Sequence, residues 1–175
     1  QHQLFSTLCE DKYHPHVALL LDIGPSFHRV AESEHYHKRW AVNKDVAASA
    51  EKILASTVKE LEEGKRTVSA DELHAAISRA AKDIQGEIPQ DHVTQTLLAS
   101  SKAISKNPYG EYGLAWWASI NPSGVKDKAY VAIAKAAKPL HFREVAEVIN
   151  KAGWSKKKAH PQTVHNELIK DKRFV

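Results

Sequence analysis

An internal repeat constrains the fold of this 175-residue chain more than any other feature of its sequence. Apolar residues of one segment recur 71 positions later without a gap: Val93, Leu97, Leu98 and Ile104 precede Val164, Leu168, Ile169 and Val175. Further upstream the offset is 72 positions, where Leu73 and Ile77 precede Val145 and Ile149. Because apolar positions at a fixed spacing mark the buried side of an element, the chain is predicted to contain two copies of one structural unit.

Each copy begins with two predicted helices. Residues 49–64 and 127–138 are the expected first helices, and a shorter amphipathic helix follows each of them. Ser69 and Glu72 have the spacing of a capping box, in which each residue satisfies a free backbone amide of the first turn. A second helix is therefore expected to start directly after Ser69.

A third helix and a hairpin complete the first copy. Pro89 and Pro161 suit the first turns of the two third helices, and Asn107, Pro108 and Gly110 are turn residues between short β-prone runs. Three helices followed by a β-hairpin, or wing, describe a winged helix-turn-helix. The expected fold class is therefore mainly α (α+β), built from tandem winged helix-turn-helix modules.

The N-terminal segment is similar to the end of a third copy. Val17 and Leu21 occupy inward positions of a third helix, and Phe27 and Trp40 fall where the two strands of a wing are expected. On this interpretation the chain is a piece of a longer protein. The expected domains are a partial winged-helix segment over residues 1–48, a winged helix over 49–122, and a winged helix lacking its terminal wing strand over 123–175.

Positive charge is concentrated in the C-terminal third. The net charge of +4 divides into −1 for residues 1–48, −2 for 49–122 and +7 for 123–175, where twelve Lys/Arg accompany five Asp/Glu. A basic face gains affinity for phosphates by releasing their counterions, so this third is the candidate for an anionic partner. The alternative is a solvated lysine-rich surface, which the charge alone does not exclude.

The third helix of the last copy has two different sides. Val164 and Leu168 face the expected core, and polar residues recur at four-residue intervals on the opposite side. The third helix of a helix-turn-helix enters the major groove, where Gln and Asn pair with adenine and Lys reaches guanine or phosphate. The alternative is an ordinary solvated helix face. The predicted DNA-binding residues are Gln162, Thr163, His165, Asn166 and Lys170, preceded by Lys156, Lys157 and Lys158.

The other two copies lack such a stripe. The positions equivalent to Gln162, Asn166 and Lys170 are Asp91, Gln95 and Ala99 in the middle copy and Pro15, Leu19 and Ile23 in the N-terminal copy. An acidic group is repelled by phosphates, and an apolar set is better packed on protein than exposed to water. Leu19 and Ile23 are therefore predicted to dock on protein.

Membrane and metal functions have little support in the sequence. The apolar runs are too short to span a bilayer and the first residues lack signal-peptide features, which indicates a cytoplasmic protein without a membrane partner. A zinc site on the N-terminal histidines is the alternative to surface histidines, which explain them more simply, and no metal or cofactor is predicted. Its candidate ligands are the pairs His14 with His16 and His35 with His37, completed by Cys9 or Glu34.

An enzymatic function is not expected either. The chain has no Gly-rich phosphate loop, no nucleophile elbow and no Cys-His pair at a recognisable spacing. No catalytic residue and no small-molecule substrate are therefore predicted.

The last third of the chain resembles a known family. "KAYVAIAKAAKPLHFREVAEVIN" followed by "HPQTVHNELIKDKRFV" resembles the HARE-type winged helix-turn-helix domain, over about residues 123–175. The domain also occurs in the delta subunit of bacterial RNA polymerase and at the C-terminus of sigma-factor-like proteins. The resemblance implies a nucleoid-associated role in transcription, without chemistry in the module itself.

These observations lead to one expected function and one alternative. The first is a transcription regulator that reads double-stranded DNA through its C-terminal winged helix and docks protein through the other segments. The alternative is a protein-interaction module associated with RNA polymerase that reads no bases.

Overall fold

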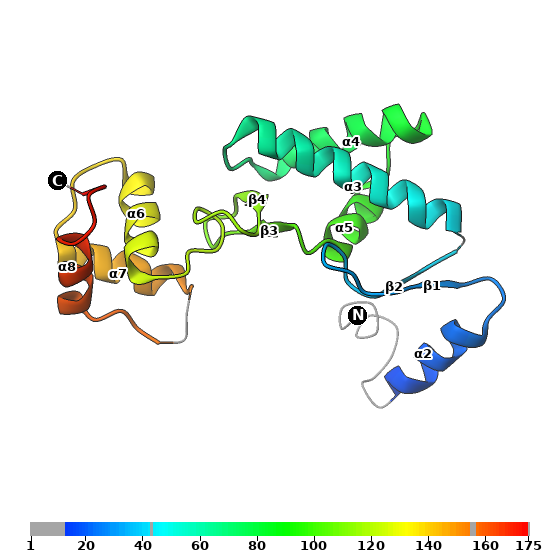
Figure 1. Ribbon diagram of the computed structural model, residues 1–175, viewed down its shortest axis with the longest axis horizontal. Coiled ribbons are helices and arrows are strands. Elements are labelled where there is room, and N and C mark those ends of the chain that lie inside the picture. The colour runs from blue at the N-terminus through cyan, green and yellow to red at the C-terminus, as the bar shows by residue number, and fades with distance from the viewer. Residues whose placement is uncertain (1–12, 43, 155–156, 175) are drawn as a thin grey trace. The chain divides into compact units, whose positions relative to one another are not determined.

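The fold is mainly helical. The computed structural model describes residues 13–42, 44–154 and 157–174. Within these ranges it has seven helices and two small antiparallel hairpins, an α+β composition (Figure 1). The described residues up to Lys65, together with Asp71–Ile104, form an N-terminal unit, and Arg66–Ala70 with the described residues from Ser105 onward form a C-terminal unit. No helix in the described part of the chain is both long and apolar enough to cross a membrane.

The N-terminal unit begins with a helix and a hairpin. Helix α2 (His14–Ile23) leads into β1 (His28–Val30), which pairs antiparallel with β2 (Arg39–Ala41) so that Arg29 lies opposite Trp40. The predicted helix over residues 17–21 and the hairpin ending near Trp40 are confirmed. Phe27 lies just before β1 rather than in the strand, because its backbone amide closes a turn by donating to the carbonyl of Gly24.

Helix α2 is tied to this hairpin by one carboxylate. The two oxygens of Asp22 accept hydrogen bonds from Trp40 Nε1 at 2.9 Å and from Arg29 at 3.1 Å. The helix itself has no buried residue, and Leu19 and Ile23 are 59% and 67% exposed. Within the described chain, the sequence therefore correctly predicted the helix, whereas the expected packing of its apolar side is not present.

Three helices follow in the N-terminal unit: α3 (Lys44–Gly64), α4 (Ala70–Gln85) and α5 (Asp91–Ser100). The first begins at Lys44 rather than at Ser49, and α4 starts directly after Ser69 as expected. Their apolar residues recur at helical spacing and are fully buried where the helices meet, as at Leu54, Leu61, Leu73 and Ile77.

The apolar register of α5 differs from the repeat. Val93 is 40% exposed, whereas Thr94 is buried to 3% and Leu97 to 9%. Threonine has nearly the shape of valine, so it takes the inward position, and the methyl groups of Val93 stay at the surface. Pro89 precedes the helix instead of opening it, because Gln90 is the extended N-cap residue.

The second hairpin belongs to the C-terminal unit apart from its first residue. It pairs β3 (Ile104–Lys106) with β4 (Tyr112–Leu114), and Val68 forms an isolated antiparallel bridge with Tyr112. Asn107 organises the turn, because its Oδ1 accepts from the amides of Tyr109 and Glu111, each at 3.0 Å. Gly110 supplies the positive φ of 86° that the turn requires. The predicted hairpin and its turn residues are confirmed.

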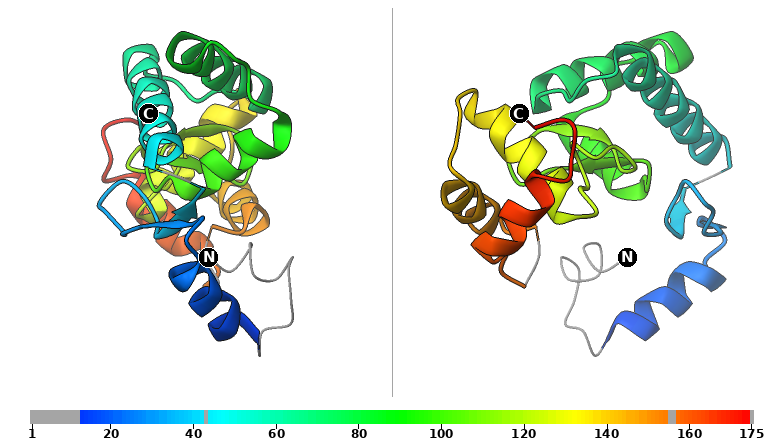
Figure 2. Two further views of the ribbon diagram at one scale, coloured as in Figure 1. Left: turned by 90° about the vertical axis from the view of Figure 1, so that its right-hand side faces the viewer. Right: turned by 60° about the vertical axis from the view of Figure 1, so that its left-hand side comes forward.

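Three helices form the rest of the C-terminal unit: α6 (Val125–Ala136), α7 (Phe142–Ala152) and α8 (Pro161–Leu168). All three contact one another, and Figure 2 shows α8 beside α6 and α7. Their shared core consists of small and branched side chains, which lets short helices approach closely: Ala129, Ala132, Val145, Ala146, Ile149 and Val164.

Candidate nucleic-acid interface

Helix α8 has one side fixed in the core and one side open to water. Val164 is fully buried and Leu168 packs at the edge of the same cluster. The side chains of Gln162, Thr163 and Asn166 are exposed, as the helical periodicity predicted. Because the buried side fixes the rotation of the helix, this polar surface is held in one orientation relative to the three-helix core.

Two side chains fix the start of α8. Asn150, on α7, pairs with the backbone of Ala159: its Oδ1 accepts from the Ala159 amide at 2.7 Å, and its amide group donates to the Ala159 carbonyl at 3.1 Å. The imidazole of His160 then caps the helix by accepting from the Gln162 amide at 3.3 Å. Sequence reasoning missed both residues.

The exposed polar groups of α8 also contact one another. The Gln162 side-chain amide donates to Asn166 Oδ1 at 3.3 Å, and the His165 ring lies 3.5 Å from the same oxygen. His165 is only half exposed because its ring packs edge to face on Phe142 at 4.9 Å. The structure therefore brings the predicted residues Gln162, His165 and Asn166 together, with His165 also serving the packing between α7 and α8.

Basic side chains flank the helix on both ends. Lys157 and Lys158 are exposed directly before it, and Lys156 lies outside the described residues. Lys170 lies in the turn after α8 rather than on the helix, and its ammonium group is 3.6 Å from the Glu167 carboxylate. An eight-residue helix is about 12 Å long, which is about the width of the major groove.

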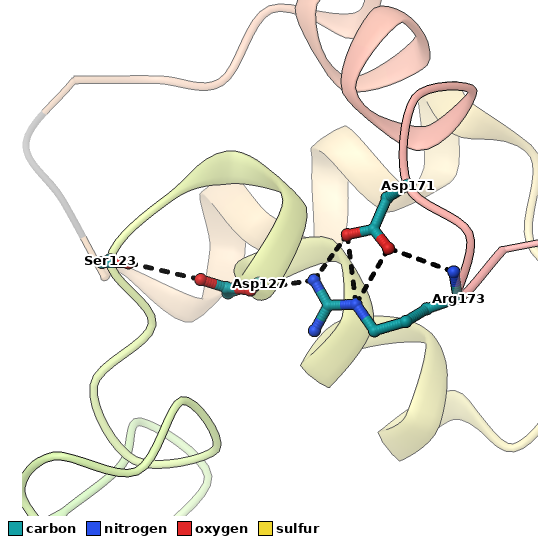
Figure 3. A network of polar contacts seen from close by, with 4 residues as sticks. All are labelled: Ser123, Asp127, Asp171 and Arg173. Atoms are coloured by element: carbon teal, nitrogen blue, oxygen red, sulfur yellow. Dashed lines mark hydrogen bonds and ion pairs between the residues drawn. The ribbon is translucent and has the colours of Figure 1, made fainter.

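The chain beyond α8 is fastened to α6 by a charged network (Figure 3). The Arg173 guanidinium contacts Asp127 at 2.9 Å and Asp171 at 2.6 Å, and it lies 4.9 Å from the Tyr130 ring. Hydrogen bonds from Arg173 lower the pKa of Asp171 to about 2. We call this network the Arg173 clasp. Sequence reasoning missed it because Asp127 is 46 residues away from Arg173.

A charged groove of about 780 Å³ lies next to the Arg173 clasp. Lysines from α6 and from the turn after α8 line it together with the acidic residues of the clasp. The clasp pairs the Arg173 charge and Glu167 pairs Lys170, so attraction of phosphates to this groove would fall mainly to Lys126 and Lys172. The lining consists of Ser123, Lys126, Asp127, Glu167, Lys170, Asp171, Lys172 and Arg173.

The remaining candidate residues lie in the N-terminal unit. Asp91, Gln95 and Ala99 are exposed on α5, and Leu19 and Ile23 are exposed on α2. In the described part of the chain, no three His, Cys, Asp or Glu side chains gather into a group that could hold a metal ion. Cys9, a candidate zinc ligand, lies outside the described residues.

Comparison with known proteins gives no relative. No family model matches the chain, and no curated protein and no solved structure matches it.

Proposed function

We propose that this protein is a transcription regulator that binds double-stranded DNA through α8 of its C-terminal unit. The observation that carries the proposal is the pairing of a core-anchored side at Val164 with an exposed stripe at Gln162 and Asn166. Amide side chains offer a donor and an acceptor together, which is the pattern that adenine presents in the major groove. Basic groups at both ends of the helix suit the phosphates of the two strands.

The proposed architecture behind this function is a series of winged helix-turn-helix modules. Helices α3, α4 and α5 precede the β3–β4 hairpin in the chain, and α6, α7 and α8 repeat the same helical order. The bridge between Val68 and Tyr112 supports this interpretation, because it gives the hairpin a third short segment from the connection between α3 and α4. The resemblance of residues 123–175 to the HARE type agrees with the same architecture.

The other segments are proposed to bind protein. Asp91 and Gln95 would present one carboxylate and one amide to a groove, and the carboxylate would be repelled by phosphate. Leu19 and Ile23 on α2 expose apolar surface in the described chain, and such surface is favourable in contact with another protein.

A second candidate function rests on the same α2 surface. In this alternative the protein associates with RNA polymerase through exposed apolar side chains such as Leu19, and it reads no bases. The two candidates differ in their dependence on salt, because phosphate contacts release counterions and apolar docking does not.

Duplex binding at several salt concentrations tests the proposed function. The full chain is expected to bind any duplex more weakly as salt rises. Replacing Lys157 and Lys158 with alanine should weaken binding to all duplexes about equally and reduce the log–log salt slope by roughly one for each phosphate that a lysine no longer neutralises. The matched control is Lys82→Ala on α4, an exposed lysine of the N-terminal unit, which should leave the slope unchanged.

The DNA-binding proposal fails if the unaltered chain shows no salt-dependent affinity for duplex DNA. It also fails if the control variant weakens binding as much as the double variant, since the interaction would then be diffuse.

A further inference from the structure

The turn of the β3–β4 hairpin is held by the helices that follow it. The Tyr109 ring packs edge to face on Trp154, which lies just after α7, with ring centroids 5.4 Å apart. Lys135 of α6 places its ammonium group 2.5 Å from a Glu111 carboxylate oxygen and 5.9 Å from the Tyr109 ring. The Tyr109 hydroxyl and the Trp154 indole nitrogen are both shielded from solvent.

This contact shifts the pKa values of two groups in the turn, Glu111 and Tyr109. The hydrogen bond from Lys135, followed by that from Asn107, lowers the pKa of Glu111. Burial raises the pKa of Tyr109. Both shifts agree with a turn whose groups are partly withdrawn from water and paired with α6.

The β1–β2 hairpin makes an equivalent contact in the N-terminal unit. Tyr36 forms a β-bridge with Ser101 and donates its hydroxyl to the Glu51 carbonyl of α3 at 3.2 Å. Lys102, just after α5, reaches back to Glu32 at 2.5 Å and to the Ser33 carbonyl at 2.9 Å.

Backbone hydrogen bonds reinforce this second contact. The amide of His37 donates to the carbonyl of Ser100 at 2.9 Å, and the amide of Lys102 donates to the carbonyl of His35 at 2.8 Å. Burial also raises the pKa of Tyr36. The loop of the hairpin is thereby attached along the end of α5 and not only through side chains.

The two hairpins follow one plan. Each hairpin precedes three helices in the chain, which form its helical triplet. In the first unit, Tyr36 contacts α3 and Glu32 contacts Lys102 just after α5. In the second unit, Glu111 contacts Lys135 of α6 and Tyr109 contacts Trp154 just after α7. Each glutamate pairs with a lysine of the helical region, namely Lys102 just after α5 in one unit and Lys135 of α6 in the other. The division of the chain into its two units agrees with this plan, because each unit combines one hairpin loop with the three helices that come after it.

We propose that both hairpins are docking elements that bind the helical triplet following them, so that their loops are not available to enter a groove of DNA. The surface that receives each loop consists of a lysine and a second group that contacts the tyrosine. In the N-terminal unit these are Lys102 and the Glu51 carbonyl, and in the C-terminal unit they are Lys135 and the Trp154 ring. The partner that fits it is a hairpin loop carrying tyrosine and glutamate. This inference does not depend on DNA binding by α8, and it holds for the free protein.

Nitrogen-15 relaxation of the full chain tests the proposal without DNA. In the unaltered protein, the amides of Gly110 and Glu111 should relax like those of α6, because they move with it. Lys135→Glu places a carboxylate opposite Glu111, and it should give the β3–β4 turn additional fast motion. Lys138→Glu is the matched control, since it makes the same charge change at an exposed position just after α6.

The same design applies to the first hairpin. Lys102→Glu should release residues 32–37 from the motion of α5, whereas the exposed Lys82→Glu should not. Turn amides that already relax independently of the helices in the unaltered protein would overturn the proposal, and so would a turn that stays rigid in both Lys135→Glu and Lys102→Glu. Titration with duplex DNA then separates the two proposals, because docked hairpins should show no shifts whether or not α8 binds.

Discussion

At the scale of single residues, the candidate interface depends on positions that hold α8 rather than on those that would touch DNA. The exposure of Gln162 and Asn166 followed from helical periodicity, because Val164 fixes the inward side. The anchoring roles of Asn150 and His160 could not be predicted in the same way. They depend on the path of the chain between α7 and α8, which brings the Ala159 backbone to Asn150, and periodicity carries no information about that path.

The Arg173 clasp predicts a pH dependence. The pKa of Asp171 is lowered from 3.8 to about 2, so its folded state favours the charged carboxylate. The stabilising contribution is therefore complete above the ordinary pKa and is lost as the pH falls through about 2. An NMR titration of the Asp171 carboxyl should find this low midpoint, and Arg173→Gln should return it towards the ordinary value. A midpoint that is ordinary in the unaltered protein would contradict the clasp.

At the scale of elements, α5 and α8 differ in how they are buried, and this predicts unequal mutational costs. Val164→Ala removes fully buried methyl groups and should lower the free energy of unfolding by about 2 kcal/mol. Val93→Ala removes half-exposed methyl groups and should cost less than about 0.5 kcal/mol. Denaturant unfolding of the two variants measures the difference. Equal costs would mean that Val93 is buried and that the apolar register of the repeat holds in α5.

The matched helices of the repeat, α4 with α7 and α5 with α8, show where the sequence pattern stops being informative. Leu73 and Ile77 of α4 match Val145 and Ile149 of α7 both in spacing and in burial, so at these positions the apolar pattern predicted the core correctly. On α5, Thr94 takes the buried position instead of Val93, because the methyl group of a threonine can pack in the core although the residue is polar. The superposition of residues 49–122 on 123–175 stays a prediction.

Helix α2 illustrates a second limit at the element scale. The inward positions of Val17 and Leu21, with Phe27 and Trp40 at expected strand positions, predict a helix and two strands. The partner of the apolar side of α2 was not predictable, because an apolar side indicates that it is covered but does not identify the element or protein that covers it. The exposed Leu19, Leu20 and Ile23 are the described residues that most favour the docking alternative.

At the scale of the whole molecule, the excess positive charge and the exposed apolar surface of α2 lie in different parts of the chain. Residues 123–175 carry +7, whereas residues 1–48 carry −1 and expose the apolar residues of α2. Under the proposed function, this division of charge and apolar surface would suit a protein that brings DNA and a protein partner together. RNA polymerase is the protein partner proposed for that role.

The effect of Asn166→Ala on duplex binding by the full chain tests the central claim most directly. Against a preferred site selected from random duplexes, the variant should lose on the order of 1–3 kcal/mol of binding free energy and should relax discrimination at one base pair. Gln95→Ala, at the equivalent position of α5, should change neither quantity. If Asn166→Ala leaves both the affinity and the preference for duplex DNA unchanged, α8 reads no bases and the docking alternative is favoured.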